Sequence, residues 1–269
     1  MKKILLPTDF SQNSENAINY AIQLFEKESC TFFLLHAYYS APSSPITKTV
    51  MQNNLDEAVS SLQKDNKNKS YDFKGILMTD SVVNAINITF INQGIDYVVM
   101  GTQGSSALRE VFLGSNTLSV IKHIDRCPVL VVPTEYHYQI PKEIMLATDY
   151  KHAFVPAELN PLTAFSKLWN SRISIVHIAT QAILSDAQLA NKTLLKTALD
   201  QTDYGFINLR KQDTLANTLL SFKKEDKDIA LFAMMRTKHG FFDTIFREPV
   251  IKTMAFQTPI PFLVLPMLK

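Results

Sequence analysis

Short runs of apolar, β-branched and aromatic residues alternate along the chain with longer segments in which apolar residues recur every three or four positions. In the first 133 residues the short runs cover 4–6, 31–37, 73–78, 97–100 and 129–132. Segment 14–27 places five apolar residues on one helical face: Ala17, Ile18, Ala21, Ile22 and Phe25. Further helices are expected at 50–65, 81–93 and 115–123. The alternation predicts βαβ units and a parallel sheet with helices on both faces.

The pattern occurs twice. Residues 2–10 (KKILLPTDF) align with residues 142–150 (KEIMLATDY), with five of nine positions identical. The runs 34–37 and 128–133 have counterparts at 175–178 and 261–266. Because a repeat fixes the architecture, we expect two domains, 1–138 and 139–269, each with a five-stranded parallel sheet.

The second copy is expected to form strands at 143–147, 172–178, 205–209, 229–233 and 262–265. Pro156 and Pro161 lie where its first helix should begin. Since proline is tolerated in the first turn of a helix and disfavoured further in, they predict a late start for this helix. Trp169 should end it and anchor the interior.

Composition narrows the class of protein. Apolar residues make up 46% and charged residues 19% of the 269 residues, as in folded globular chains. With 27 Lys+Arg against 25 Asp+Glu, neither a nucleic acid nor an anionic membrane is the first expectation. The apolar runs are too short to span a bilayer or to form a signal peptide, so a cytoplasmic location is expected.

Two residue types are read as structural. Cys30 and Cys127 are too few for a disulfide framework or a structural zinc site and are interpreted as buried small residues, with a redox pair as the alternative. The six histidines show no paired metal-ligand spacing. His36 and His177 occupy equivalent strand positions and are interpreted as core or crevice residues.

Three of the seven glycines form the pattern G-x2-G-x9-G-[ST], as Gly101, Gly104 and Gly114 followed by Ser115. Gly101 follows the expected fourth strand and Gly114 precedes a helix, so backbone N–H groups and a helix N-terminus converge at the carboxyl edge of the sheet. Glycine lets the backbone approach an anion and adopt positive φ. Ser115, Asn116 and Thr117 would add side-chain donors, and the pattern predicts a phosphate site.

Asp9 follows the first strand and would lie beside the same crevice. There it can accept from ribose hydroxyls or help to hold Mg²⁺. The alternative is a structural role as the N-cap of the helix that begins near Ser14.

The duplicated pattern, the Pro7-Thr8-Asp9 opening, the Leu34-to-Ala37 strand and the glycine motif together resemble the universal stress protein family, in its tandem form. The resemblance covers nearly the whole chain, and the glycine motif is typical of the ATP-binding branch. It implies an α/β fold, flavodoxin-like or Rossmann-like, with strand order 3-2-1-4-5. It also implies pairing of domains through the last strands, Val129–Val132 and Phe262–Leu265, and a possible homodimer.

The resemblance further implies that Asp9 contacts the ribose and that the Ala37 backbone contacts the adenine, while residues 100–104 and 114–117 hold the phosphates. The cofactor would be ATP, ADP or AMP, with Mg²⁺. The expected nucleotide-binding residues are Pro7, Thr8, Asp9, Ala37, Met100, Gly101, Gly104, Gly114, Ser115, Asn116 and Thr117.

The second copy departs from this motif. Met234, Thr237 and Arg247 align with the three glycines, and Glu248 aligns with Ser115. We expect no ATP site there, and Asp149 is interpreted as a possible helix cap. A basic pocket of Arg236, Lys238, His239 and Arg247 is one hypothesis; a solvated loop paired with Glu248 and Asp243 is the favoured one.

The sequence is compatible with more than one class of function. The first hypothesis is a nucleotide-binding regulatory protein of the stress response with at most slow ATPase activity, because backbone amides stabilise ground and transition states alike. The alternative is a non-enzymatic interaction protein that binds no nucleotide or another anion. A nucleotide-transforming enzyme is disfavoured, since the sequence shows no second substrate site.

Overall fold

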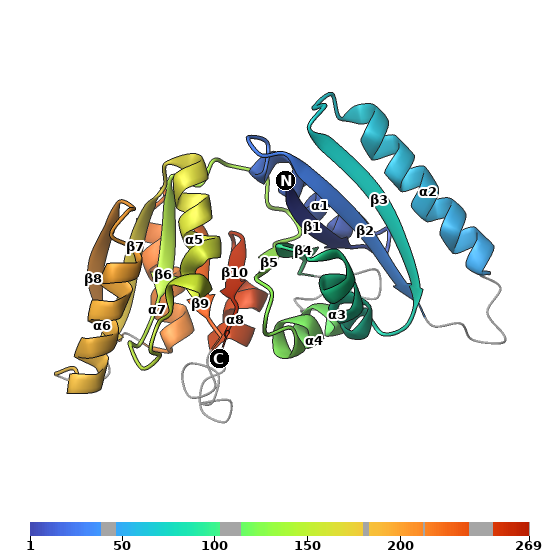
Figure 1. Ribbon diagram of the computed structural model, residues 1–269. Helices are drawn as coiled ribbons and strands as arrows, with labels where there is room; N and C mark the ends of the chain where they lie inside the picture. Colours follow the sequence, from blue (N-terminus) through green and yellow to red (C-terminus); the bar gives the residue numbers. More distant parts are fainter. Residues whose placement is uncertain (39–46, 103–113, 180–182, 212, 237–249, 269) are drawn as a thin grey trace. The chain divides into compact units, whose positions relative to one another are not determined.

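The computed structural model describes residues 1–38, 47–102, 114–179, 183–211, 213–236 and 250–268 (Figure 1). The chain divides into two compact units, Met1–Tyr138 and Gln139–Lys269.

The described residues of unit 1 form a parallel five-stranded sheet and four helices (Figure 1). Its elements are β1 (Lys2–Pro7), α1 (Gln12–Leu24), β2 (Cys30–Tyr38), α2 (Lys48–Asp65), β3 (Tyr71–Thr79), α3 (Val82–Gln93), β4 (Tyr97–Gly101), α4 (Ser115–His123) and β5 (Val129–Val132). The strand pairings give the order β3-β2-β1-β4-β5.

Unit 2 repeats this arrangement. Its elements are β6 (Glu143–Ala147), α5 (Pro156–Trp169), β7 (Arg172–Ala179), α6 (Asp186–Ala198), β8 (Tyr204–Arg210), α7 (Leu215–Glu225), β9 (Ile229–Met235), α8 (Val250–Gln257) and β10 (Phe262–Leu265). The pairings run β8-β7-β6-β9-β10, all parallel. The expected α/β fold is confirmed, and each expected strand is present with its ends within two residues of the predicted ones.

The central strands are buried on both faces, as helices on both sides of a parallel sheet require. Ile4, Leu5 and Leu6 of β1 are all fully buried, as are Ile144 and Leu146 of β6. Helix starts are set by hydroxyl caps: the side chains of Ser11, Thr47, Ser81, Ser185 and Thr214 each accept a backbone N–H of the first turn.

The expectation about the two prolines is half wrong. Helix α5 begins at Pro156, as expected, but continues through Pro161 to Trp169. Pro161 removes one helical hydrogen bond and strains the turn before it. Burial of Leu159, Leu162 and Phe165 on the same helix offsets this cost. Trp169 ends the helix and is 6% exposed, which confirms its role as an interior anchor.

Both cysteines are buried and neither forms a disulfide, as expected. Burial raises the pKa of the Cys30 thiol from 9.0 to about 12, and burial raises the pKa of Cys127 further still. The folded state therefore favours the neutral thiol. This contribution to stability is complete below the unfolded pKa and is lost as the pH rises through the folded one.

We therefore expect that a thiol reagent at about pH 8 labels neither cysteine in the folded chain, because the thiolate is the reactive form. The same reagent should label both cysteines once the chain is unfolded in guanidinium. Absorbance of the released chromophore measures the count, and rapid labelling of the folded chain would contradict the burial of the two thiols.

Candidate nucleotide site

The first candidate segment is the turn that follows β1. The backbone N–H of Thr8 donates to the Leu35 carbonyl at 2.9 Å, which continues the β1–β2 pairing past the end of the strand. Phe10 then adopts φ 61°, a left-handed conformation that non-glycine residues rarely take. The Thr8 hydroxyl holds this conformation by accepting the Phe10 N–H at 3.0 Å. The turn leaves Asp9 half-buried at the carboxyl edge of the sheet.

Asp9 does not cap α1. The N-cap is Ser11, whose hydroxyl accepts the Ser14 N–H. The Asp9 carboxylate oxygen Oδ1 accepts from the Ser11 N–H at 3.1 Å and from the Ser11 hydroxyl at 2.6 Å. The alternative role as a helix cap is therefore wrong, because a serine two residues later is closer to the first turn. Asp9 is instead oriented by the residue that caps the helix.

His36 fixes the same turn from β2. Its ring atom Nδ1 lies 2.8 Å from the Thr8 carbonyl oxygen, and its ring centroid lies 4.6 Å from that of Phe10. His36 is 7% exposed. The interpretation of this histidine as a core or crevice residue is confirmed: it positions the segment that carries Asp9. Ala37, the next residue, is half-buried near the end of β2.

The second candidate segment joins the end of β4 to the start of α4. The Thr117 hydroxyl donates to the Gly101 carbonyl at 2.9 Å, and the Gly114 N–H donates to the Thr102 carbonyl at 2.9 Å. These two bonds bring the N-terminus of α4 to the carboxyl end of β4. Met100, Gly101 and Thr117 are buried there, while Ser115 and Asn116 are exposed. Gly104 falls in 103–113, outside the described residues.

The start of α4 has the features of an anion site. Gly114 is the N-cap and supplies no side-chain acceptor, and the first turn contains no acidic residue. The first N–H groups of a helix have no acceptor within the helix, and the helix dipole favours negative charge beside them. The last turn carries Lys122 and His123, which match the opposite end of the dipole.

Two expectations about this segment need correction. Gly114 has φ −55°, so it does not use positive φ; its lack of a side chain is what matters. The Thr117 hydroxyl has a single proton, which is donated to Gly101. Thr117 therefore locks the helix to the strand, which leaves the first backbone N–H groups and the exposed side chains of Ser115 and Asn116 as the donors at this helix start.

The turn after β6 has the same geometry as the turn after β1. Tyr150 adopts φ 58°, and its N–H donates to the Thr148 hydroxyl at 3.0 Å. His177 Nδ1 lies 3.0 Å from the Thr148 carbonyl, and Asp149 Oδ1 accepts the Lys151 N–H at 3.0 Å. The N-cap of α5 is Val155, so Asp149 is not a helix cap either.

The two turns differ in what covers them. In unit 2, Gln188 donates to the Asp149 carbonyl at 2.8 Å and Asn191 donates to the Tyr150 carbonyl at 2.9 Å, both from α6. Tyr150 is fully buried, whereas Phe10 is 37% exposed. In the basic pocket that the sequence suggests for unit 2, Arg236 donates its backbone N–H to the Leu265 carbonyl at 3.2 Å. Lys238, His239, Asp243, Arg247 and Glu248 lie outside the described residues.

The left-handed aromatic residues Phe10 and Tyr150 are not among the residues expected from the sequence, although the repeated Thr-Asp-aromatic triplet marks both of them. Neither is Glu158 of α5, which is fully buried. The Glu158 carboxylate accepts from His152 Nε2 at 2.7 Å, from the Val155 N–H at 3.2 Å and from the Leu268 N–H at 3.1 Å. No local pattern predicts the last contact, because the two residues are 110 positions apart.

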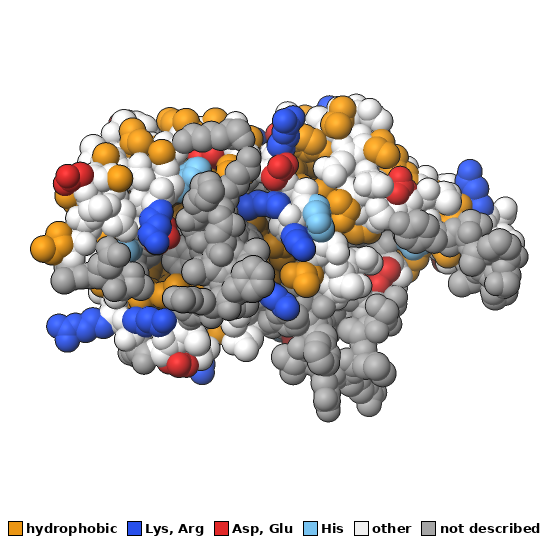
Figure 2. Space-filling model, turned by 90° about the horizontal axis from the view of Figure 1, so that it is seen from below, with side chains coloured by type: hydrophobic (Ala, Val, Ile, Leu, Met, Phe, Trp, Pro, Cys, Tyr) orange, Lys and Arg blue, Asp and Glu red, His pale blue; other side chains and the backbone are white. Residues whose placement is uncertain are grey.

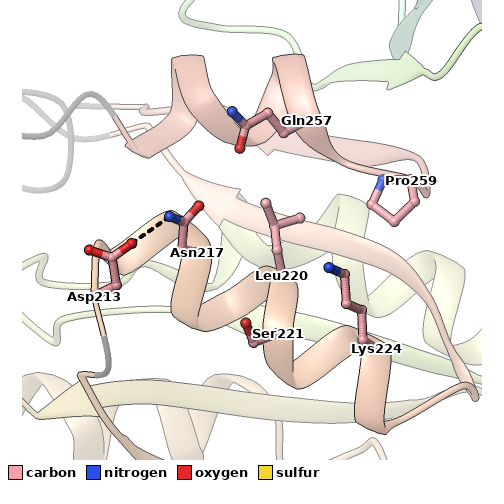
Figure 3. Close-up of a pocket in the computed structure, with 7 residues that line it drawn as sticks. All are labelled: Asp213, Asn217, Leu220, Ser221, Lys224, Gln257 and Pro259. Carbon is pink, nitrogen blue, oxygen red and sulfur yellow. Dashed lines mark hydrogen bonds between the residues drawn. The ribbon is translucent and has the colours of Figure 1, made fainter.

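A groove of about 510 Å³ lies between α7 and α8 of unit 2 (Figure 3). Asn217 donates to Asp213 at 2.7 Å on its wall, and Lys224 lies further along the same helix (Figure 3). The groove contains none of the expected nucleotide residues. We do not assign it to the nucleotide site.

Matches in sequence to known proteins each cover about half of this chain. The model of the universal stress protein family matches residues 1–133. Universal stress protein MJ0577 of Methanocaldococcus jannaschii is 30% identical over an alignment of 154 positions, and the match covers 49% of this chain and 94% of the relative. The chain belongs to the universal stress protein family.

A solved universal stress protein from Archaeoglobus fulgidus matches with a TM-score of 0.72 and 16% identity, over 98% of this chain and 96% of the other. This likeness shows that the family fold extends through both units. A family protein from Arabidopsis thaliana with AMP bound matches 49% of this chain and 92% of its own, at 14% identity. Its TM-score of 0.35 is too low to assign ligand contacts here.

Two further observations concern this universal stress protein as a whole. Among the described residues, no helix is long and apolar enough to cross a membrane, and no group of three potential metal ligands is present. On the face seen in Figure 2, the described lysine and arginine side chains lie among acidic, uncharged and hydrophobic ones.

Proposed function

We propose that unit 1 binds an adenine nucleotide, ATP with Mg²⁺ in the first instance, and that the protein acts as a nucleotide-dependent regulator in the cytoplasmic stress response. The observation that supports this most is that Asp9 and the glycine-capped N-terminus of α4 follow two neighbouring parallel strands, β1 and β4, at the same edge of the sheet. A carboxylate suits ribose hydroxyls, and helix N–H groups suit phosphates.

The proposal assigns roles within this edge. Pro7, Thr8 and Asp9 face the ribose, the Ala37 backbone faces the adenine, and Met100, Gly101, Gly104 and Gly114–Thr117 surround the phosphates. His36 and Thr117 are positioning residues. His36 of β2 holds the turn that follows β1, and Thr117 holds α4 to the end of β4. No described residue is assigned as a catalytic base, so hydrolysis is expected to be slow at most.

Unit 2 is proposed to bind no ATP. Met234, which aligns with Gly101, is buried in β9, and α6 donates two hydrogen bonds to the turn that carries Asp149. Pairing through the edge strands β5 and β10, within a chain or in a homodimer, is a further part of the proposal, since unpaired strand edges favour association.

The test is calorimetric titration of nucleotide-stripped protein with Mg·ATP. We expect one site per chain, and ADP and AMP should compete for it. Thermal unfolding gives an independent readout, since ligand at 100 times its Kd stabilises the fold by about 2.7 kcal/mol. Two sites per chain would refute the loss of the second site. Absence of both heat and a melting shift would favour the alternative, an interaction protein without nucleotide.

A further inference from the structure

A hollow of about 210 Å³ lies in unit 1 between α1 and α2, below the turn that carries Phe10. Five apolar side chains line it: Phe10, Ile18, Leu34, Ala58 and Leu62. Thr8, Ser14, Glu15 and Ser61 complete the wall. Leu34 is fully buried and Ile18 is 7% exposed, so these two form the apolar floor.

The hydroxyl groups of the wall have partners within the protein. Ser14 Oγ donates to the Ser11 carbonyl at 2.8 Å, and Ser61 Oγ donates to the Asp65 carboxylate at 3.1 Å. Thr8 Oγ1 accepts the Phe10 N–H. An occupant therefore does not need to supply hydrogen bonds, which favours an apolar molecule. The exposed carboxylate of Glu15 disfavours an anionic one.

In the second unit the equivalent aromatic residue is Tyr150, which other side chains cover completely. Phe206 of β8 lies 6.4 Å from the Tyr150 ring, and Lys192 Nζ lies 5.5 Å from the same ring. With the turn geometry the same in both units, the 37% exposure of Phe10 does not come from its backbone conformation. It reflects the open hollow beside the ring. Helix α2 fits this account, because Leu55 is its one fully buried residue among those described.

We propose that this hollow binds a small neutral aromatic molecule, which packs on the Phe10 ring and on Leu34. Its size sets the class of ligand: cavities of about 150 Å³ accommodate benzene, so 210 Å³ suits a bicyclic ring such as indole. Aromatic rings pair with offset or edge-to-face geometry, which the partly exposed Phe10 ring offers.

The hollow is separate from the proposed nucleotide site. Thr8 belongs to both, but Ala37, Met100, Gly101 and Gly114 do not line the hollow. The inference goes beyond the proposed function and does not depend on it.

The experiment uses the full chain and indole, with saturation-transfer NMR to detect binding and a titration to measure it. Ala58→Phe, from a half-buried position of α2, should fill the hollow and weaken indole binding at least tenfold. Ala190→Phe makes the same substitution at an exposed position of α6 and should leave binding unchanged. Ser61→Phe provides a second block from the rim if Ala58→Phe fails to fold.

Three outcomes would overturn the proposal: no indole binding, binding that survives a folded Ala58→Phe or Ser61→Phe chain, or an equal loss in Ala190→Phe. Indole that binds at an adenine subsite, and not in the hollow, would still bind to a folded Ala58→Phe chain. Mg·ATP titration of Ala58→Phe, expected to match the unaltered chain, keeps failure of this proposal distinct from failure of the nucleotide site.

Discussion

A chain carrying Gly114→Glu is expected to bind Mg·ATP at least 100-fold more weakly than the unaltered chain while keeping its fold. Gly114 has φ −55° and ψ 138°, a conformation open to any residue, so the substitution does not strain the backbone. A carboxylate beside the first turn of a helix is also favourable to the helix itself.

The loss of binding follows from charge. A carboxylate about 4 Å from a phosphate charge raises the energy by about 4 kcal/mol at an effective dielectric constant of about 20. Roughly 2.7 kcal/mol already corresponds to a 100-fold weaker Kd. Calorimetric titration measures the loss, and thermal unfolding checks the fold.

Two matched variants separate charge from other causes. His123→Glu adds the same carboxylate at the exposed C-terminal end of the same helix and should bind Mg·ATP like the unaltered chain. Gly114→Ala adds a methyl group without charge and should lose much less affinity. Full binding by folded Gly114→Glu would show that phosphates do not approach α4.

Glu158→Ala is expected to destabilise unit 2 by about 3 kcal/mol or more. Glu158 is fully buried and accepts from His152, from the Val155 N–H and from the Leu268 N–H. Alanine leaves these donors without their acceptor at a fully buried position. Unmatched buried donors and charges are among the costliest consequences of a single substitution.

Trp169 gives a direct readout, because this single tryptophan ends the same helix and is buried. Urea unfolding followed by its fluorescence measures the stability of the second unit. Glu225→Ala is the matched control in the same unit: it removes an exposed acidic residue from the last turn of α7 and should cost less than about 0.5 kcal/mol. A Glu158→Ala chain as stable as this control would contradict the buried cluster.

The helices and strands are predictable from the sequence because their signals are local. Apolar periodicity marks each segment, and serine or threonine caps such as Ser11 and Thr214 mark where helices begin. Pro161 shows the limit of a local rule: packing of the surrounding apolar residues outweighs the preference of one residue.

The candidate site is predictable in part. The glycine motif indicates the start of α4, but the role of Thr117 depends on a carbonyl 16 residues earlier in the chain, which only the fold brings near. Likewise, the contact of His36 with Thr8 joins two strands, and no spacing along the chain indicates it. The left-handed conformation of Phe10 is not marked by a glycine, and its one signal in the sequence is the repeated Thr-Asp-aromatic triplet.

The threonine-aspartate-aromatic turn also bears on how duplicated domains diverge. Both copies keep its threonine, its carboxylate and its histidine, although the glycines beside it survive in the first copy alone. The hydrogen bonds of the turn stabilise the fold in both copies, so retention of the turn does not require a bound ligand. In this chain an aspartate in the turn is therefore weaker evidence of a nucleotide site by itself than together with the glycine motif, which only the first copy has.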